Sequence, residues 1–302
     1  MKRASAWAAS IGLSLATLAG ATVAIGIRQA ASLPIERHLS VDLPEWPRGA
    51  SPLRVALLSD IHFGNRAMSI ERLNSIVERV NAARPDLILI AGDFVVGHDA
   101  VGASERAAGL EVPLCRLNAP LGVIAVLGNH DHWTAPDAIR AALTRARITV
   151  LENRAVRRGP VTVVGVDDAF SGRDDLGRAV ASLVGLGGVP ILLTHSPDLV
   201  HKLRGGFPLV VAGHTHCGQV VLPWYGPLLM RAPRENWRPL YDVRYRCGVV
   251  RDTDRVIVVT AGVGSGSSPV RLGAPPDWWL LIVGPQREQA DTDRPPGANL
   301  VP

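Results

Sequence analysis

Short runs of Val, Ile, Leu and Ala that end abruptly at a polar residue recur along most of this chain and constrain its fold more than any other feature. Apolar runs of four to eight residues bounded by turn signals are typical of strands buried on both faces. Residues 69–84 instead have apolar positions at helical spacing. Early strand–helix alternation followed by a strand-rich half predicts an α/β protein, a sandwich with mixed sheets.

The individual elements follow from the same periodicity. Helices are predicted at 69–84 and 135–146. Strands are predicted at 53–60, 86–93, 122–131, 148–153, 161–168, 190–198, 208–216, 255–262 and 278–284.

Polar side chains gather at the carboxyl ends of five predicted strands. In open α/β sheets the functional crevice lies outside those ends, so these residues are expected in one site. They are Asp60, His62, Asp93, Asn129, His130, Asp131, His195, His214 and His216. Gly92, Gly128 and Gly213 each precede one of them, which predicts tight backbone turns beside a crowded site.

The pair His214 and His216 is separated by one residue after an apolar run. A strand alternates its faces, so these two histidines are expected to share one strand face, where two adjacent metal ions can each take one imidazole. Imidazole nitrogens mixed with carboxylate and amide oxygens suit Mn, Fe, Zn or Co better than Ca or Mg. Two bridged divalent ions clamp a phosphate and activate a water, which predicts a hydrolase acting on phosphate esters.

Five short motifs, SDIH, AGDF, LGNHD, LTHSPD and AGHTH, occur in this order between residues 54 and 283. The ordered set resembles the calcineurin-like metallophosphoesterases. That resemblance implies a four-layer α-β-β-α sandwich with a dimetal site at the carboxyl ends of the strands. It implies a first metal on Asp60, His62 and His216, a bridging Asp93, and a second metal on Asn129, His195 and His214.

The resemblance also implies that His130 acts on the leaving group and is oriented by Asp131, while a hydroxide held by the metals attacks. The N-terminal segment and the Gly-rich stretch near the end resemble a bacterial membrane-associated branch of phosphodiesterases and UDP-2,3-diacylglucosamine pyrophosphatases of lipid A synthesis. Cys217 stands where that branch has Gly; it either perturbs the metal site or merely fills the Gly position. A broad-specificity envelope phosphatase and a catalytically silent envelope-binding module are the alternatives.

The N-terminal segment 1–28 is uncharged from Ala4 to Ile27, long enough to span a bilayer. It is either a transmembrane anchor or a signal peptide cleaved near the AGA at 19–21. We expect a single-pass membrane anchor with the body outside the cytoplasm, although the flanking charges do not enforce this orientation.

The rest of the chain divides by composition. Residues 29–51 are rich in Pro and are predicted to be a linker, 52–284 form the phosphoesterase domain, and 285–302 are predicted to be a disordered tail. The aromatic, basic segment 223–247 is either a flap that contacts lipid or substrate tails or an excursion packed on the sheet. Arg271 and His98 are predicted to be surface residues.

A formal net charge of +5 favours anionic partners. Basic blocks with interleaved aromatic residues are missing, which disfavours nucleic acid. The expected partners are a phosphorylated small molecule or glycolipid and a membrane, with the chain as a monomer. Three widely spaced cysteines without a CxxC pattern say little about compartment.

Overall fold

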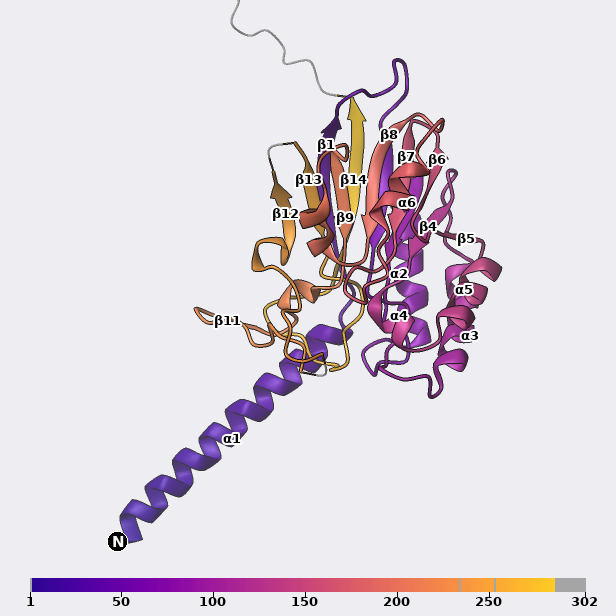
Figure 1. The fold of residues 1–302 in the computed structure, drawn as a ribbon. Coiled ribbons are helices and arrows are strands. Elements are labelled where there is room, and N and C mark those ends of the chain that lie inside the picture. Colours follow the sequence, from indigo (N-terminus) through magenta and orange to yellow (C-terminus); the bar gives the residue numbers. More distant parts are fainter. Residues whose placement is uncertain (1, 234, 253, 286–302) are drawn as a thin grey trace, which may run out of the picture.

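Two six-stranded sheets form the centre of the molecule in the computed structural model, which describes residues 2–233, 235–252 and 254–285 (Figure 1). The first sheet has the spatial order β1 (Ile35–Leu43), β14 (Asp277–Pro285), β2 (Leu53–Leu58), β3 (Leu87–Ala91), β4 (Val123–Val126) and β5 (Ile148–Val150). The second has the order β12 (Gly248–Arg251), β13 (Val256–Val259), β9 (Leu209–Ala212), β8 (Val189–Thr194), β7 (Val161–Val166) and β6 (Arg154–Arg158).

Both sheets are mixed, as expected. The antiparallel pairs are β14 with β2, β12 with β13, and β6 with β7; the other neighbours run parallel. The arrows of β12 and β14 point the same way in Figure 1. Because β13 and β2 run against them, the parallel sets that include the strands preceding the predicted site residues, β2–β5 in the first sheet and β13, β9, β8 and β7 in the second, end at the opposite end of the sandwich. That end is also where the N-terminal helix leaves the body (Figure 1).

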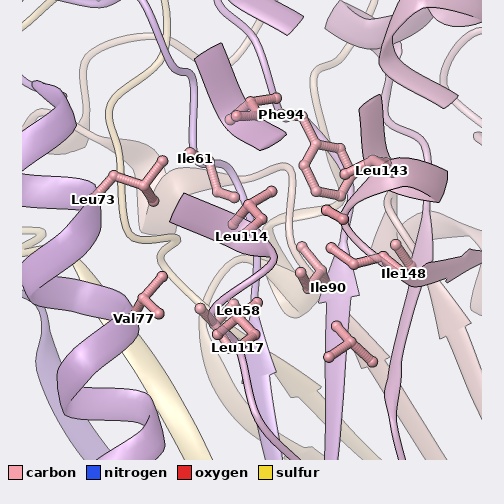
Figure 2. Close-up of a cluster of buried hydrophobic side chains, with 14 of the residues drawn as sticks. Leu58, Ile61, Leu73, Val77, Ile90, Phe94, Leu114, Leu117, Leu143 and Ile148 are labelled. Atoms are coloured by element: carbon pink, nitrogen blue, oxygen red, sulfur yellow. The ribbon is translucent and has the colours of Figure 1, made fainter. Parts of the chain in front are cut away.

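Helices cover the outer faces of the sheets and complete the four predicted layers. The first sheet packs against α2 (Ile70–Ala82), α3 (Ala103–Leu114) and α5 (Pro136–Arg145), with the buried cluster of Figure 2 between them. The second packs against α6 (Leu176–Ala181) and the 3-10 turns η1 (Pro197–Lys202) and η3 (Val243–Tyr245). The predicted fold class is therefore confirmed.

Strand periodicity explains how one strand serves two cores. Val55 and Leu57 of β2 point into the core between the sheets, whereas Ala56 and Leu58 pack under the helices. All four are at most 2% exposed. Burying a Val or Leu side chain contributes about 1.5–3 kcal/mol, so a near-continuous apolar run is what a strand between two apolar layers requires.

The predicted linker 29–51 is wrong in its central part. Residues 35–43 form β1, which pairs in parallel with β14 along nine positions from Ile35 with Asp277 to Leu43 with Pro285. Its side chains alternate, and only Val41 and Leu43 are buried. An edge strand with one solvent-facing side needs few apolar residues, so its polar sequence between prolines looked like a linker.

The N-terminal helix α1 spans Lys2–Ala31 and projects from the body (Figure 1). Among the residues that the structure describes, Gly12–Ala31 is long and apolar enough to cross a bilayer, with a mean hydropathy of 1.3. A signal sequence has the same features. The body holds the last turns of α1 firmly: Arg72 donates to the carbonyl oxygens of Ala31 and Ser32. The tail predicted at 285–302 lies outside the described residues, apart from Pro285 at the end of β14.

Candidate metal centre

Loops at the carboxyl ends of the parallel strands bring the predicted ligands together. The first group joins Asp60 and His62, which follow β2, to His216, which follows β9. His216 Nε2 lies 3.1 Å from His62 Nε2 and 3.4 Å from Asp60 Oδ1. The three side chains are nearly inaccessible to solvent.

Asp93, which follows β3, occupies the middle of the site. Its Oδ2 lies 3.5 Å from His62 Nε2 on one side and 3.3 Å from His195 Nε2 on the other. Its Oδ1 accepts a hydrogen bond of 2.9 Å from the backbone N–H of His130. One carboxylate oxygen is thus fixed by the backbone, while the other faces both groups of imidazoles.

The second group contains Asn129, His195 and His214, which follow β4, β8 and β9. His195 Nε2 lies 3.1 Å from Asn129 Oδ1 and 3.3 Å from His214 Nδ1. Its Nδ1 lies 2.6 Å from the carbonyl oxygen of Ala91, which fixes the ring. All seven predicted ligands therefore lie in one buried cluster with Asp93 between two sets.

The backbone at this cluster is strained. Five of the predicted ligands have φ between 47° and 70°, in the left-handed region that residues other than glycine rarely adopt. They are Asp60, His62, Asp93, His214 and His216. The expectation that His214 and His216 share a strand face is wrong, because β9 ends at Ala212 and left-handed turns follow. These turns still deliver one imidazole to each group.

Glycines permit the close approach of these turns. Gly92 has a φ of 80°. A Cβ there would lie 2.6 Å from the backbone nitrogen of Gly128, and a Cβ at Gly213 would lie 2.6 Å from Asp60 Oδ2. The predicted crowding beside the glycines is confirmed, although only Gly92 of the three has a positive φ.

Electrostatics in the cluster favour cation binding. Burial, with repulsion from Asp93, raises the pKa of Asp60 to about 7 despite nearby His195. Burial lowers the pKa of His62 and of His214 to about 3, so both imidazoles are neutral and can offer a lone pair. Burial alone would raise the pKa of Asp93, but His195, through its charge and a hydrogen bond, holds it well below its ordinary value.

The hydrogen bonding of the Asp60 carboxylate indicates whether a metal fits this cluster. Asp60 Oδ1 is buried and has no hydrogen-bond partner, whereas Asp60 Oδ2 accepts from Ser59 and from the backbone of His214. A buried carboxylate oxygen without a partner is costly in an empty protein interior. Together with the mixed nitrogen and oxygen donors around it, this oxygen fits a divalent cation.

The predicted orientation of His130 by Asp131 is not what the structure shows. His130 Nδ1 lies 2.5 Å from the carbonyl oxygen of Gly97. The Asp131 carboxylate instead accepts from the backbone N–H groups of Asp93, Phe94 and Gly128 at 2.8–2.9 Å. Asp131 therefore ties the turns after β3 and β4 together.

A cavity of about 500 Å³ opens over the cluster. Its lining combines apolar side chains of residues 220–241 with Asp93, Asn129, His130, His214 and His216. His98, predicted to be a surface residue, lines it, stacks on Trp133 and lies 2.7 Å through Nε2 from Ser267 Oγ. No periodic signal marks His98, because it lies in an irregular loop after β3.

Arg271 and Cys217 also differ from expectation. Arg271 is fully buried; its guanidinium donates to backbone carbonyls, including those of Ala261 and Gly264, and to His216 Nδ1 at 2.9 Å. It braces the loop carrying His216 and does not reach the cavity as a surface charge. Cys217 forms a disulfide with Cys247, so it is neither a free thiol beside the metals nor a passive small residue.

Fold and cluster together define a metal-binding α/β enzyme with its site at strand ends. The sequence model of the calcineurin-like phosphoesterases matches residues 53–218. The chain belongs to this family and carries a metal-dependent phosphoesterase domain.

The relatives of this chain include metallophosphoesterases, some of which are named transmembrane proteins. The chain is 29% identical over 240 residues to the uncharacterized metallophosphoesterase YkuE of Bacillus subtilis, covering 76% of this chain and 79% of the relative. It is 30% identical over 261 residues to an uncharacterized metallophosphoesterase of Aquifex aeolicus, covering 83% and 92%. A transmembrane protein with metallophosphoesterase domain of Danio rerio is 29% identical over 280 residues, covering 86% and 60%.

Proposed function

We propose that this protein is a membrane-anchored, two-metal phosphoesterase that hydrolyses a phosphodiester or pyrophosphate bond of an amphiphilic substrate. UDP-2,3-diacylglucosamine, the substrate implied by the resemblance to the membrane-associated branch, is one candidate of this chemistry. The observation that carries the proposal is a cavity lined both by the metal cluster and by an apolar wall of side chains from residues 220–241.

The apolar wall favours an amphiphile over a small soluble ester. Leu228, Leu229 and Leu240 line the cavity together with Phe170 and Trp133. Apolar side chains around a few convergent polar groups are typical of sites that bind a ligand with a hydrocarbon part. A phosphate at the cluster would leave the attached apolar group against this wall.

The proposed roles follow the two groups of ligands. Asp60, His62 and His216 would hold one ion, Asn129, His195 and His214 the other, and Asp93 would join them. Two divalent ions, when bound, neutralise phosphoryl oxygens and lower the pKa of a water. The donor set suits Mn, Fe or Zn.

His130 is the proposed acid for the leaving group. Its ring lies 4.9 Å, centroid to centroid, from that of His62 and lines the cavity. Gly97 holds Nδ1, which fixes the orientation of the ring. Asp131 takes no direct part in this step; it positions the backbone of Asp93 and Gly128.

The disulfide supports the proposed location outside the cytoplasm. Disulfides persist in oxidising compartments and are rare where thiols are kept reduced. Cys217 and Cys247 are bonded, and α1 has the length and composition of a membrane span. We propose that α1 is retained as an anchor and that the body faces an oxidising compartment.

The substrate proposal is tested by a matched pair of variants in detergent solution. The double substitution Leu228→Gln/Leu229→Gln makes part of the apolar wall polar. Losing apolar contact equivalent to about one CH₂ group at each position weakens binding by roughly 1.4 kcal/mol in all. We therefore expect KM for the acylated UDP-2,3-diacylglucosamine to rise about tenfold. Hydrolysis of bis-p-nitrophenyl phosphate, which has no acyl chain, should stay unchanged. Val184→Gln, at an exposed apolar residue outside the cavity, is the control. An equal loss on both substrates would contradict the proposal.

A further inference from the structure

Residues 219–247, which we name the flap, expose more large apolar side chains than any comparable described stretch of the body. Trp224 is fully exposed, Tyr225 is 75% exposed and Trp237 is 61% exposed. Leu228, Leu229, Met230 and Val243 are exposed as well. Large apolar side chains exposed in such number on one segment are typical of an interaction site.

We propose that the flap docks into the interfacial region of the phospholipid bilayer that α1 crosses, so that the mouth of the metal centre opens at the membrane surface. The proposal rests on the retention of α1 as an anchor, proposed above. It adds a second membrane contact, made by the catalytic body itself.

The first support is the direct connection between α1 and the flap. The backbone N–H of Arg271 donates to the carbonyl oxygen of Gly26 in α1 at 3.0 Å. The next residue, Leu272, donates to Gln219, and Val221 donates back to Leu272 at 2.7 Å. One short segment is therefore bonded to the last turns of α1 on one side and to the base of the flap on the other.

The flap and α1 also leave the same end of the molecule. In Figure 1 the loop that carries β11 (Gly226–Pro227) projects on the side toward which α1 extends. A bilayer crossed by α1 must therefore pass close to this loop. Because the backbone bonds at Gly26 and Arg72 fix the end of α1 to the body, the flap cannot easily turn away from that surface.

The chemistry of the exposed side chains favours a lipid interface over a dry protein interface. Trp and Tyr concentrate at the boundary between headgroups and acyl chains, where an apolar ring can carry a polar atom. Arg231, which is exposed next to Met230 in the sequence, adds a positive charge that the headgroup phosphates attract. Leu228 and Leu229 supply apolar area next to them.

The base of the flap is closed covalently. The Cys217–Cys247 disulfide joins its two ends, and β10 (Val221–Leu222) pairs with β11 within it. Thr215 also donates to the carbonyl oxygen of Arg246 at 2.6 Å. A flap braced in this way can present its aromatic residues to a bilayer without first paying for the ordering of a free loop.

The test measures how deeply the flap tryptophans sit. The full-length chain is reconstituted into phosphatidylcholine vesicles with and without lipids brominated in the upper acyl chain, which quench nearby tryptophan. The fluorescence of Trp224→Phe/Trp237→Phe is subtracted from that of the wild type, so the difference reports these two residues. We expect about a twofold loss of that difference emission in brominated vesicles, as for interfacial tryptophans.

A matched control places a tryptophan far from the proposed contact. Val184→Trp, added to the double variant, lies in the turn before β8 starts, at the end of the strand away from the metal cluster, and residue 184 is 85% exposed. Its emission should not be quenched. Because all the substituted positions are at the surface, these variants are expected to keep the fold.

The outcomes separate the docking of the flap from the anchor. Carbonate extraction of the same vesicles reports whether α1 is inserted. Carbonate-resistant protein with a quenched difference emission supports the proposal. Carbonate-resistant protein with an unquenched difference emission overturns flap docking and leaves the anchor intact. Protection of the flap tryptophans from brominated lipid by self-association into dimers would equally overturn docking into the bilayer. Protein that carbonate extracts overturns the anchor, and with it the basis of the proposal.

Discussion

Asp93→Ala should reduce hydrolysis of bis-p-nitrophenyl phosphate at least about 10³-fold, which corresponds to about 4 kcal/mol of lost transition-state stabilisation. Its Oδ2 is the atom that faces both groups of imidazoles, at 3.5 Å from His62 and 3.3 Å from His195. Without it, two cations would lose their shared ligand and the repulsion between them would be unscreened. Metal content per chain, measured by mass spectrometry, should fall together with activity.

The fold should survive this substitution better than the chemistry. Asp93 is one of several groups in the cluster, and removing its carboxylate from between the two groups of imidazoles does not open a large cavity in the apolar core. The thermal midpoint of the metal-free variant should therefore stay close to that of the metal-free wild type. Activity and bound metal at wild-type levels in Asp93→Ala would show that the carboxylate does not join two metals.

Asp131→Ala should act in a different way and lower stability by at least about 4 kcal/mol. Its carboxylate accepts from four buried backbone N–H groups, those of Asp93, Phe94, Val95 and Gly128. Each buried donor left without a partner costs about 1–3 kcal/mol. For a domain of this size that loss lowers the thermal midpoint by about 10 °C or more. Calorimetry of the full-length protein in detergent measures it.

A second carboxylate provides the matched control for Asp131. Asp198 accepts from a single backbone N–H, that of Asp242, at 2.9 Å outside the metal cluster. Asp198→Ala should cost about 1–2 kcal/mol by the same reasoning. If Asp131→Ala kept full stability but lost activity, Asp131 would act on His130 or on substrate, as the family resemblance first implied, and the structural role described here would be wrong.

Much of the fold could be predicted because its core strands have a local signal. Residues 55–58 are buried on both faces, and only an apolar run satisfies two cores at once. The gathering of site residues followed from the same strands, since parallel strands end at one edge. Neither inference needed knowledge of long-range contacts.

The parts that were missed depend on contacts between distant residues. β1 is an edge strand whose polar sequence becomes a strand only by pairing with β14, about 240 residues later. The burial of Arg271 depends on carbonyls of Ala261 and Gly264 that happen to surround it. The pairing of Cys217 with Cys247 could not be read from spacing either, because three cysteines allow more than one bond.

Metal dependence is decided by hydrolysis of bis-p-nitrophenyl phosphate by the full-length protein in detergent, measured before and after metal removal. The structure predicts activity that chelation abolishes and that Mn²⁺, Fe²⁺ or Zn²⁺ restores, with a thermal midpoint that falls on chelation, because bound ions stabilise the folded state by about 4 kcal/mol at a thousandfold excess over Kd. Activity that persists after complete chelation, or bound metal without hydrolysis of any phosphoric ester, would contradict a metal-dependent phosphoesterase.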